Sequence, residues 1–184
     1  YKSLYCVDTN YVIGLGGVNL YNQLYDKKRI LLGGGGRTST QKGTAIATRG
    51  GNGGGIIIIL SEVLVGNNYR INSNGESVAD TATAGAGGGG GGGVVLLGIN
   101  TFPDTVNLLA KGGNGGNTNG ANCNGTGGGG GGGAVLFRKP SSPSNIIIDI
   151  TKGENGLDVT CGNPGSSVGS DGGAKYNVHI PLTG

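Results

Sequence analysis

Long runs of glycine, each followed directly by a short apolar segment, limit the fold of this chain more than any other feature. Residues 50–55 are glycine-rich and precede Ile-Ile-Ile-Ile-Leu, while two runs of seven glycines, 87–93 and 127–133, precede Val-Val-Leu-Leu and Ala-Val-Leu-Phe. Glycine inside a helix costs about 1 kcal/mol per residue relative to alanine, so a helical bundle or coiled coil is excluded. Because the glycines come in blocks and not at every third position, a collagen triple helix is excluded too.

These blocks recur with a period of about 40 residues. They end at residues 55, 93 and 133, and a degenerate fourth copy ends at residue 174. Each full copy carries a second apolar segment about a dozen residues later, and a period of this length is typical of stacked or solenoidal proteins with an atypical last copy as a cap. We therefore divide the chain into a Tyr-rich, basic N-terminal cap or assembly segment, 1–49, and a glycine-rich repeat domain, 50–184, with units at about 50–86, 87–126, 127–168 and 169–184.

The apolar segments are continuous and rich in β-branched residues, which predicts short strands buried on both faces. A seven-residue glycine block in polyproline-II geometry is roughly 22 Å long, close to the roughly 23 Å of seven strand residues. Without Cβ atoms, such blocks can approach closely and exchange backbone hydrogen bonds. We expect an all-β, glycine-rich fold with repeated short buried strands at a period of about 38–41 residues. Its polyglycine-II segments would pack as a layer, in a solenoid-like arrangement or a layered sandwich.

Polar segments such as 72–75 (Asn-Ser-Asn-Gly) follow each second apolar segment and are expected to form turns. Glycine makes up 45 of the 184 residues. Ordering them costs roughly 20 to 45 kcal/mol beyond alanine, several times the stability of a typical domain. Each backbone hydrogen bond returns about 1 kcal/mol net, so the layers must be extensive or continue into neighbouring subunits. We expect a homo-oligomer or polymer.

The sequence contains few side chains that could catalyse a reaction or bind a cofactor. His179 is the single histidine and has no partner motif, and no glycine block is followed by Gly-Lys-Ser/Thr. The cysteines are too scattered for a zinc site. We therefore expect a protein that is not an enzyme, with no cofactor and no metal.

Nucleic acid and membrane are not expected partners either. The net charge is +3, and only Lys27, Lys28 and Arg29 form a basic cluster, without interleaved aromatic residues. No apolar stretch approaches the roughly 20 residues that span a bilayer.

Two features suggest covalent modification in an oxidising, extracellular setting. Cys123 and Cys161 lie 38 residues apart, about one period, so they can stand over each other in successive units as a candidate disulfide; two buried free thiols is the alternative. Cys6 would then be left over. Residues 124–126 (Asn-Gly-Thr) form a sequon that makes Asn124 a candidate for glycosylation.

Tyrosine is concentrated at the N-terminus. The residues can form either a core that caps the first repeat or an assembly surface. The candidate assembly residues are Tyr1, Tyr5, Tyr11, Tyr21 and Tyr25.

The repeating pattern apolar-x-Gly-x-Asn-Gly, a polar stretch, seven glycines and then Val-Val-Leu-Leu or Ala-Val-Leu-Phe resembles the glycine-rich modules of extracellular surface proteins. Similar blocks form packed polyglycine helices in phage tail-fibre tip adhesins and in the glycine-rich region of anaplastic-lymphoma-kinase-type receptors. The resemblance covers residues 50–180. It implies an extracellular, non-enzymatic scaffold and transfers no functional residue.

Two functions follow as hypotheses. The first is an extracellular structural subunit of a filament, sheath or surface layer, which assembles through strand and polyglycine packing. The second is a receptor-binding adhesin, such as a phage tail-fibre tip, that binds a cell-surface glycan or protein through its loops. Both place the chain outside the cell or on a cell or virion surface. We favour the structural subunit, because the loops contain few of the aromatic residues that binding sites usually recruit.

Overall fold

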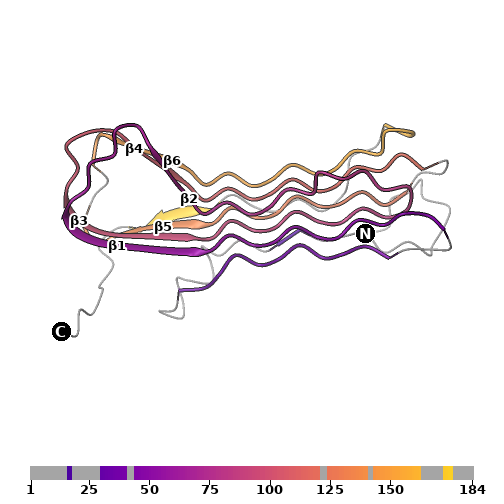
Figure 1. The fold of residues 1–184 in the computed structure, drawn as a ribbon, viewed down its shortest axis with the longest axis horizontal. Helices are drawn as coiled ribbons and strands as arrows, with labels where there is room; N and C mark the ends of the chain where they lie inside the picture. The colour runs from indigo at the N-terminus through magenta and orange to yellow at the C-terminus, as the bar shows by residue number, and fades with distance from the viewer. Residues whose placement is uncertain are drawn as a thin grey trace.

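The chain forms two small open sheets of parallel strands. The computed structural model describes residues 16–17, 30–40, 44–120, 124–140, 143–162 and 172–175. Those residues contain no helix, so the expected all-β class is confirmed. The first sheet has the order β1 (Ile56–Val63), β3 (Val94–Thr101), β5 (Ala134–Phe137), β7 (Gly173–Lys175), and the second has the order β2 (Arg70–Asn72), β4 (Val106–Leu109), β6 (Ile146–Asp149) (Figure 1).

The register of the strands follows the spacing of the glycine blocks. In the first sheet, Ile56 pairs with Val94, Val94 pairs with Ala134, and Ala134 pairs with Gly173. Strands β1, β3 and β5 each start directly after a glycine block, so the end of the block coincides with the start of the strand. The degenerate fourth glycine block was expected to end at residue 174, with a strand after it, but β7 already begins at Gly173. The residues after 175 lie outside the described part.

A hydrophobic core lies between the two sheets, which face each other at one end of the molecule (Figure 1). Alternate residues of β1 to β6 point to this core, as the pleat requires. The buried members are Val95, Leu97, Ile99, Phe102, Val106, Leu108, Val135 and Phe137.

The opposite face of the first sheet is covered only in part. Val94, Leu96, Ala134 and Leu136 are buried there, with Leu31 packed against them. In β1, however, the residues on this face are exposed. The expectation that Ile56–Leu60 is buried on both sides was therefore wrong, because β1 is an edge strand.

Outside the sheets, the glycine segments continue as extended chains that run side by side (Figure 1). Successive N–H groups of one block donate in different directions. Gly89 donates to Gly128 O (2.9 Å), Gly90 to Glu76 O (3.0 Å) and Gly91 to Gly34 O (2.8 Å). One glycine block therefore bonds to three other segments of the chain, including one from the N-terminal 49 residues.

These segments come too close together for side chains. Only Gly162 among the described glycines has a positive φ, so left-handed backbone is not the general reason for glycine here. A Cβ on Gly90 would overlap the carbonyl oxygen of Asn52, and a Cβ on Gly130 or on Gly75 would overlap that of Gly90. Gly75 therefore does not lie in a turn. Residues 73–79 leave β2 as an extended segment packed against a glycine block.

This packing predicts a large difference between two Gly→Ala changes. Gly90→Ala should lower the free energy of unfolding by about 3 kcal/mol or more, because its methyl group meets backbone that cannot move aside. Gly55→Ala is the control, since nothing lies within 4 Å of its Cβ position. It should be neutral or stabilising by up to about 1 kcal/mol. Denaturant unfolding of both variants measures the difference, and equal effects would contradict close packing.

Candidate functional site

The most exposed apolar feature of the fold is strand β1. Within the described ranges it pairs only with β3, so its other edge has no strand partner among those residues. We call this the open edge. Figure 1 shows β1 as the outermost arrow of its sheet.

The open edge is also apolar on one face. Ile57 and Ile59 point to the core, whereas Ile56, Ile58 and Leu60 are 37%, 53% and 46% exposed. We call these three residues the apolar row. Exposed edge strands of this kind are templates for pairing with another chain, and natural sheets usually protect them with charge, proline or brevity. Residues 56–60 contain none of these devices, and the charged residue of β1, Glu62, lies near the end of the strand.

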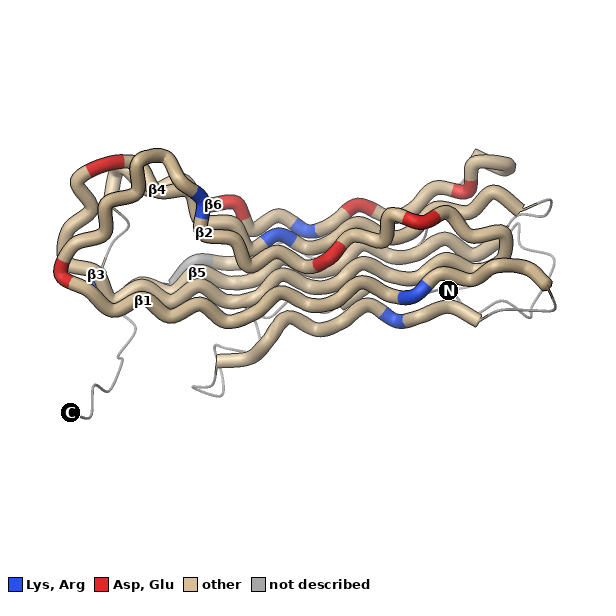
Figure 2. The backbone as a smooth tube through the Cα atoms, viewed as in Figure 1, with Lys and Arg blue, Asp and Glu red and all other residues tan. Residues whose placement is uncertain are grey.

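The far edge of the second sheet differs, because it carries charge. In the first sheet, the far strand β7 is described over Gly173–Lys175 and pairs with β5. In the second sheet, β6 ends at Asp149 and is followed by the exposed residues Lys152 and Glu154. Figure 2 shows that charged residues line the layer that continues from the second sheet. Charged residues thus follow the far edge of the second sheet, while the open edge lies on the other side.

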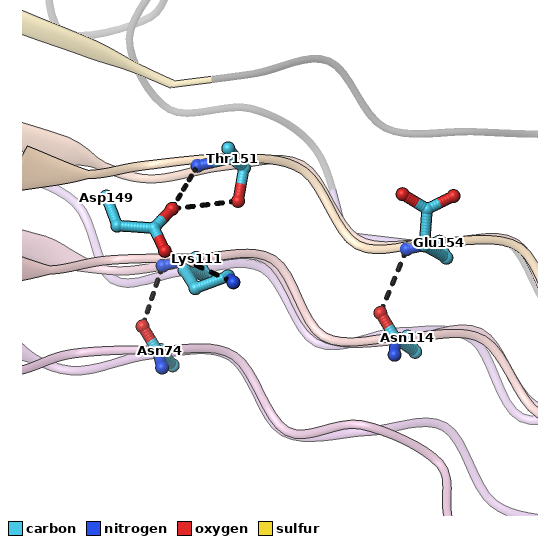
Figure 3. Close-up of polar contacts among 6 residues, drawn as sticks. All are labelled: Asn74, Lys111, Asn114, Asp149, Thr151 and Glu154. Atoms are coloured by element: carbon cyan, nitrogen blue, oxygen red, sulfur yellow. Dashed lines mark hydrogen bonds and ion pairs between the residues drawn. The ribbon is translucent and has the colours of Figure 1, made fainter.

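Within the molecule, asparagine side chains join segments that lie about 40 residues apart in the sequence. Asn74 Oδ1 accepts a hydrogen bond from Lys111 N–H (2.7 Å), and the following Gly75 N–H donates to Lys111 O (2.8 Å). The side chain of Asn74 and the backbone of Gly75 thus bind both backbone groups of Lys111. We call this pair of hydrogen bonds a clamp, and Figure 3 shows the bond from Lys111 to Asn74.

The same clamp recurs twice. Asn114 Oδ1 accepts from Glu154 N–H (2.9 Å) and Gly115 N–H donates to Glu154 O (2.9 Å), as Figure 3 shows in part. Similarly, the carboxamide of Asn117 accepts from Leu157 N–H (2.8 Å). The sequence predicted a turn at 72–75 and other polar segments like it, and carried no sign of this role.

An ion pair supports the first clamp. Lys111 Nζ lies 3.2 Å from Asp149 Oδ2, with both side chains partly exposed (Figure 3). Partial burial raises the pKa of Asp149, but hydrogen bonds from Thr151 and Lys111 and the charge of Lys111 outweigh this, so the pKa lies below its usual value. The ionised carboxylate therefore adds stability at neutral pH, and this contribution is lost as pH falls through the lowered pKa.

The loops at the sheet end of the molecule are held in a related way. Asp104 accepts from Gly66 N–H (2.5 Å) and from Asn67 N–H (3.1 Å). Asn67 and Asn68 have φ values of 45° and 61°, which asparagine tolerates better than most residues. Next to this turn, Tyr69 is 76% exposed.

A buried carboxylate organises the opposite end. Asp158 is only 2% exposed and accepts backbone hydrogen bonds from Asn124 (2.7 Å), Thr160 (2.9 Å) and Cys161 (3.0 Å). No pattern in the sequence pointed to Asp158, because its partners lie in two different repeats.

Of the cysteines, Cys161 is disulfide-bonded. Cys123 and Cys6 lie outside the described residues, so the pairing of Cys123 with Cys161 stays a prediction. Asp158 supports it, because this carboxylate holds the backbone of Cys161 and of Asn124, the neighbour of Cys123.

The fold does not present Asn124 for glycosylation. Its side chain is buried, and its Nδ2, the atom that would carry a glycan, donates to Thr83 O (2.9 Å). The expected modification would replace this bond. The proposed assembly tyrosines, Tyr1, Tyr5, Tyr11, Tyr21 and Tyr25, all lie outside the described residues, as does His179.

Among the described residues, no group of three or more His, Cys, Asp or Glu side chains could hold a metal ion. No helix in that part of the chain is long and apolar enough to span a bilayer. Searches against protein-family models, curated proteins and solved structures gave no match.

If the clamps join the repeats, removing one should weaken the fold. Asn114→Ala should lower the free energy of unfolding by about 0.5 to 1.5 kcal/mol, the usual net worth of one hydrogen bond. The control is Asn119→Ala, an exposed asparagine whose side chain makes no hydrogen bond to the described residues. Denaturant unfolding compares the two, and equal stabilities would mean that the clamp adds nothing.

The disulfide is tested by peptide mapping without reduction. We expect a cross-linked peptide that contains Cys123 and Cys161, because their neighbours share the Asp158 carboxylate. A cross-link between Cys6 and Cys161 would contradict this pairing.

Proposed function

We propose that this chain is an extracellular structural protein that assembles with copies of itself into a filament, sheath or surface layer. The open edge of β1, with its apolar row, is the observation that carries the proposal. Burying three half-exposed aliphatic side chains and pairing an eight-residue strand edge both favour association.

The glycine segments in this proposal are polyglycine-II helices packed as a layer, and the repeats form an open, solenoid-like stack. A helix with three residues per turn points successive N–H groups about 120° apart. The three directions in which Gly89, Gly90 and Gly91 donate support this geometry. An open stack can be extended by another copy without changing its internal bonding, which suits a structural subunit.

An adhesin is the second candidate, and Tyr69 favours it. This aromatic ring is 76% exposed in a loop that Asp104 and Asn107 hold by hydrogen bonds. A rigid loop with one exposed tyrosine can contact a glycan or protein. We rank it second because the apolar row is larger than this single side chain.

The proposal is tested by putting a charge into the apolar row. Ile58→Lys should raise the concentration at which the chain assembles by about tenfold or more, since a lysine at the contact must lose water without a partner. Its side chain points to solvent in the isolated chain, so folding should be unaffected. Val159→Lys is the matched control, because Val159 is 61% exposed but lies away from β1.

Assembly is measured by light scattering and negative-stain electron microscopy at micromolar concentration. Wild-type protein that remains monomeric would contradict a structural role and favour the adhesin. If Ile58→Lys assembles as the wild type does, the open edge is not the contact.

A further inference from the structure

Six asparagines in this chain are followed directly by glycine, and the structure holds them in different ways. Asparagine is thermolabile, and a following glycine favours deamidation because it has no Cβ to hinder attack by its backbone nitrogen. We propose that a clamp protects an Asn-Gly pair from deamidation, and that the pairs without one, at Asn52 and Asn119, deamidate in the folded protein. The reaction is independent of the proposed self-assembly. The six residues are Asn52, Asn74, Asn114, Asn119, Asn124 and Asn155.

Deamidation joins the two residues of the pair into a ring. The backbone nitrogen of the glycine loses its proton and bonds to Cγ of the asparagine, while the bond from Cγ to Nδ2 breaks and ammonia leaves. Water then opens the ring, adding OH to one of the two carbonyl carbons and H to the nitrogen, and the product is aspartate or isoaspartate. Both the side-chain amide and the glycine N–H must therefore give up any hydrogen bond that they make in the folded protein.

The clamps at Asn74 and Asn114 hold both of these groups. Oδ1 accepts one hydrogen bond and the N–H of the next glycine donates the other, and Figure 3 shows the side-chain bond of each. At Asn155 the same two groups bind one glycine block. Its Oδ1 accepts from Gly129 N–H (3.0 Å), and the next N–H along the chain donates to Gly127 O (2.8 Å). Ring closure at these three pairs has to break two hydrogen bonds first.

Asn52 and Asn119 lack a clamp within the described ranges. Both residues are exposed, and their side chains make no hydrogen bond to the residues described there. The N–H groups of Gly53 and Gly120 donate to none of those residues either. The backbone of Asn52 is nevertheless fixed, since its N–H donates to Glu76 Oε2 (2.9 Å) and its carbonyl oxygen accepts from Glu76 N–H (2.8 Å). A missing clamp, and not a loose chain, is thus what distinguishes this pair.

Burial alone predicts a different order of reaction. Asn114 is exposed, as Asn52 is, but its side chain is clamped. Gly120 is buried, whereas Gly53 is half-buried. If burial of the glycine controlled the reaction, Asn119 would be protected. Control by the clamp instead predicts that Asn119 reacts and Asn114 does not.

The product at Asn52 would disturb the segment that leads into β1. Its new carboxylate would lie beside the carboxylate of Glu76, which already accepts from Asn52 N–H, and like charges this close repel. Isoaspartate also lengthens the main chain between Gly51 and Gly54, whose N–H groups both donate to the next glycine block. A longer main chain cannot keep both bonds at their present spacing. Deamidation therefore loosens this segment as the protein ages.

Peptide mapping by mass spectrometry tests the proposal on the full chain with its disulfide intact. Folded protein is held at mildly alkaline pH, and conversion of each Asn-Gly pair to aspartate or isoaspartate is followed over time. The reference is the same protein in denaturant, where all six pairs should react at similar rates. Asn52 and Asn119 should react in the folded protein at close to their denatured rates. The other three, Asn74, Asn114 and Asn155, should react roughly 30-fold more slowly than in denaturant, because two hydrogen bonds of ordinary net strength must open first.

Other patterns of reaction overturn the proposal. Asn124 is buried and its Nδ2 donates to Thr83 O (2.9 Å), so it is expected to be slow for either reason and the other pairs decide. Clamped pairs that react as fast in the folded as in the denatured protein would show that the clamps give no protection. If Asn52 were as slow as Asn114, the clamp would not be what separates them. A protected Asn119 beside a reactive Asn52 would assign the control to burial of the glycine.

Discussion

Close approach of neighbouring backbones is the constraint on which this structure depends. At Gly75, Gly90 and Gly130 a methyl group would overlap a carbonyl oxygen of another segment, although almost none of the described glycines needs a left-handed backbone. The absence of Cβ atoms allows one block to hydrogen-bond in three directions. Strands β3 and β5 begin directly where such blocks end. The spacing of these blocks agrees with the register of the first sheet, and the hydrophobic core forms among the strands that follow the glycine segments.

Much of the fold could be predicted from the sequence because two local signals agree. A glycine block followed by aliphatic residues recurs about every 40 residues. The strands pair in the register that this spacing predicts, with Ile56 beside Val94 and Val94 beside Ala134. The sequence could not tell which strand lies at an edge. Ile56–Leu60 is more apolar than Ala134–Phe137, yet the second is buried and the first is not. Burial here depends on the position of a strand in the stack, which composition does not report.

The polar contacts were harder to predict for a related reason. Asn-Gly is a strong signal for a tight turn when only its neighbours in sequence are considered. At Asn74 and Asn114 the partner lies 37 and 40 residues away, and this distant backbone makes the extended conformation favourable. Asp158 likewise joins two repeats. Residues that act between repeats carry no local pattern, so they become visible only after the register is known.

The stacking direction has a mechanical consequence. Hydrogen bonds in both sheets run from one repeat to the next, across the chain direction of the strands. A pulling force that separates β1 from β7 therefore acts on all these strand pairs in series, and the weakest pair opens first. The clamps at Asn74, Asn114 and Asn117 reinforce the joints that such a force would open. Under tension the chain should lengthen in steps of about one repeat, with each released repeat leaving the remaining stack intact.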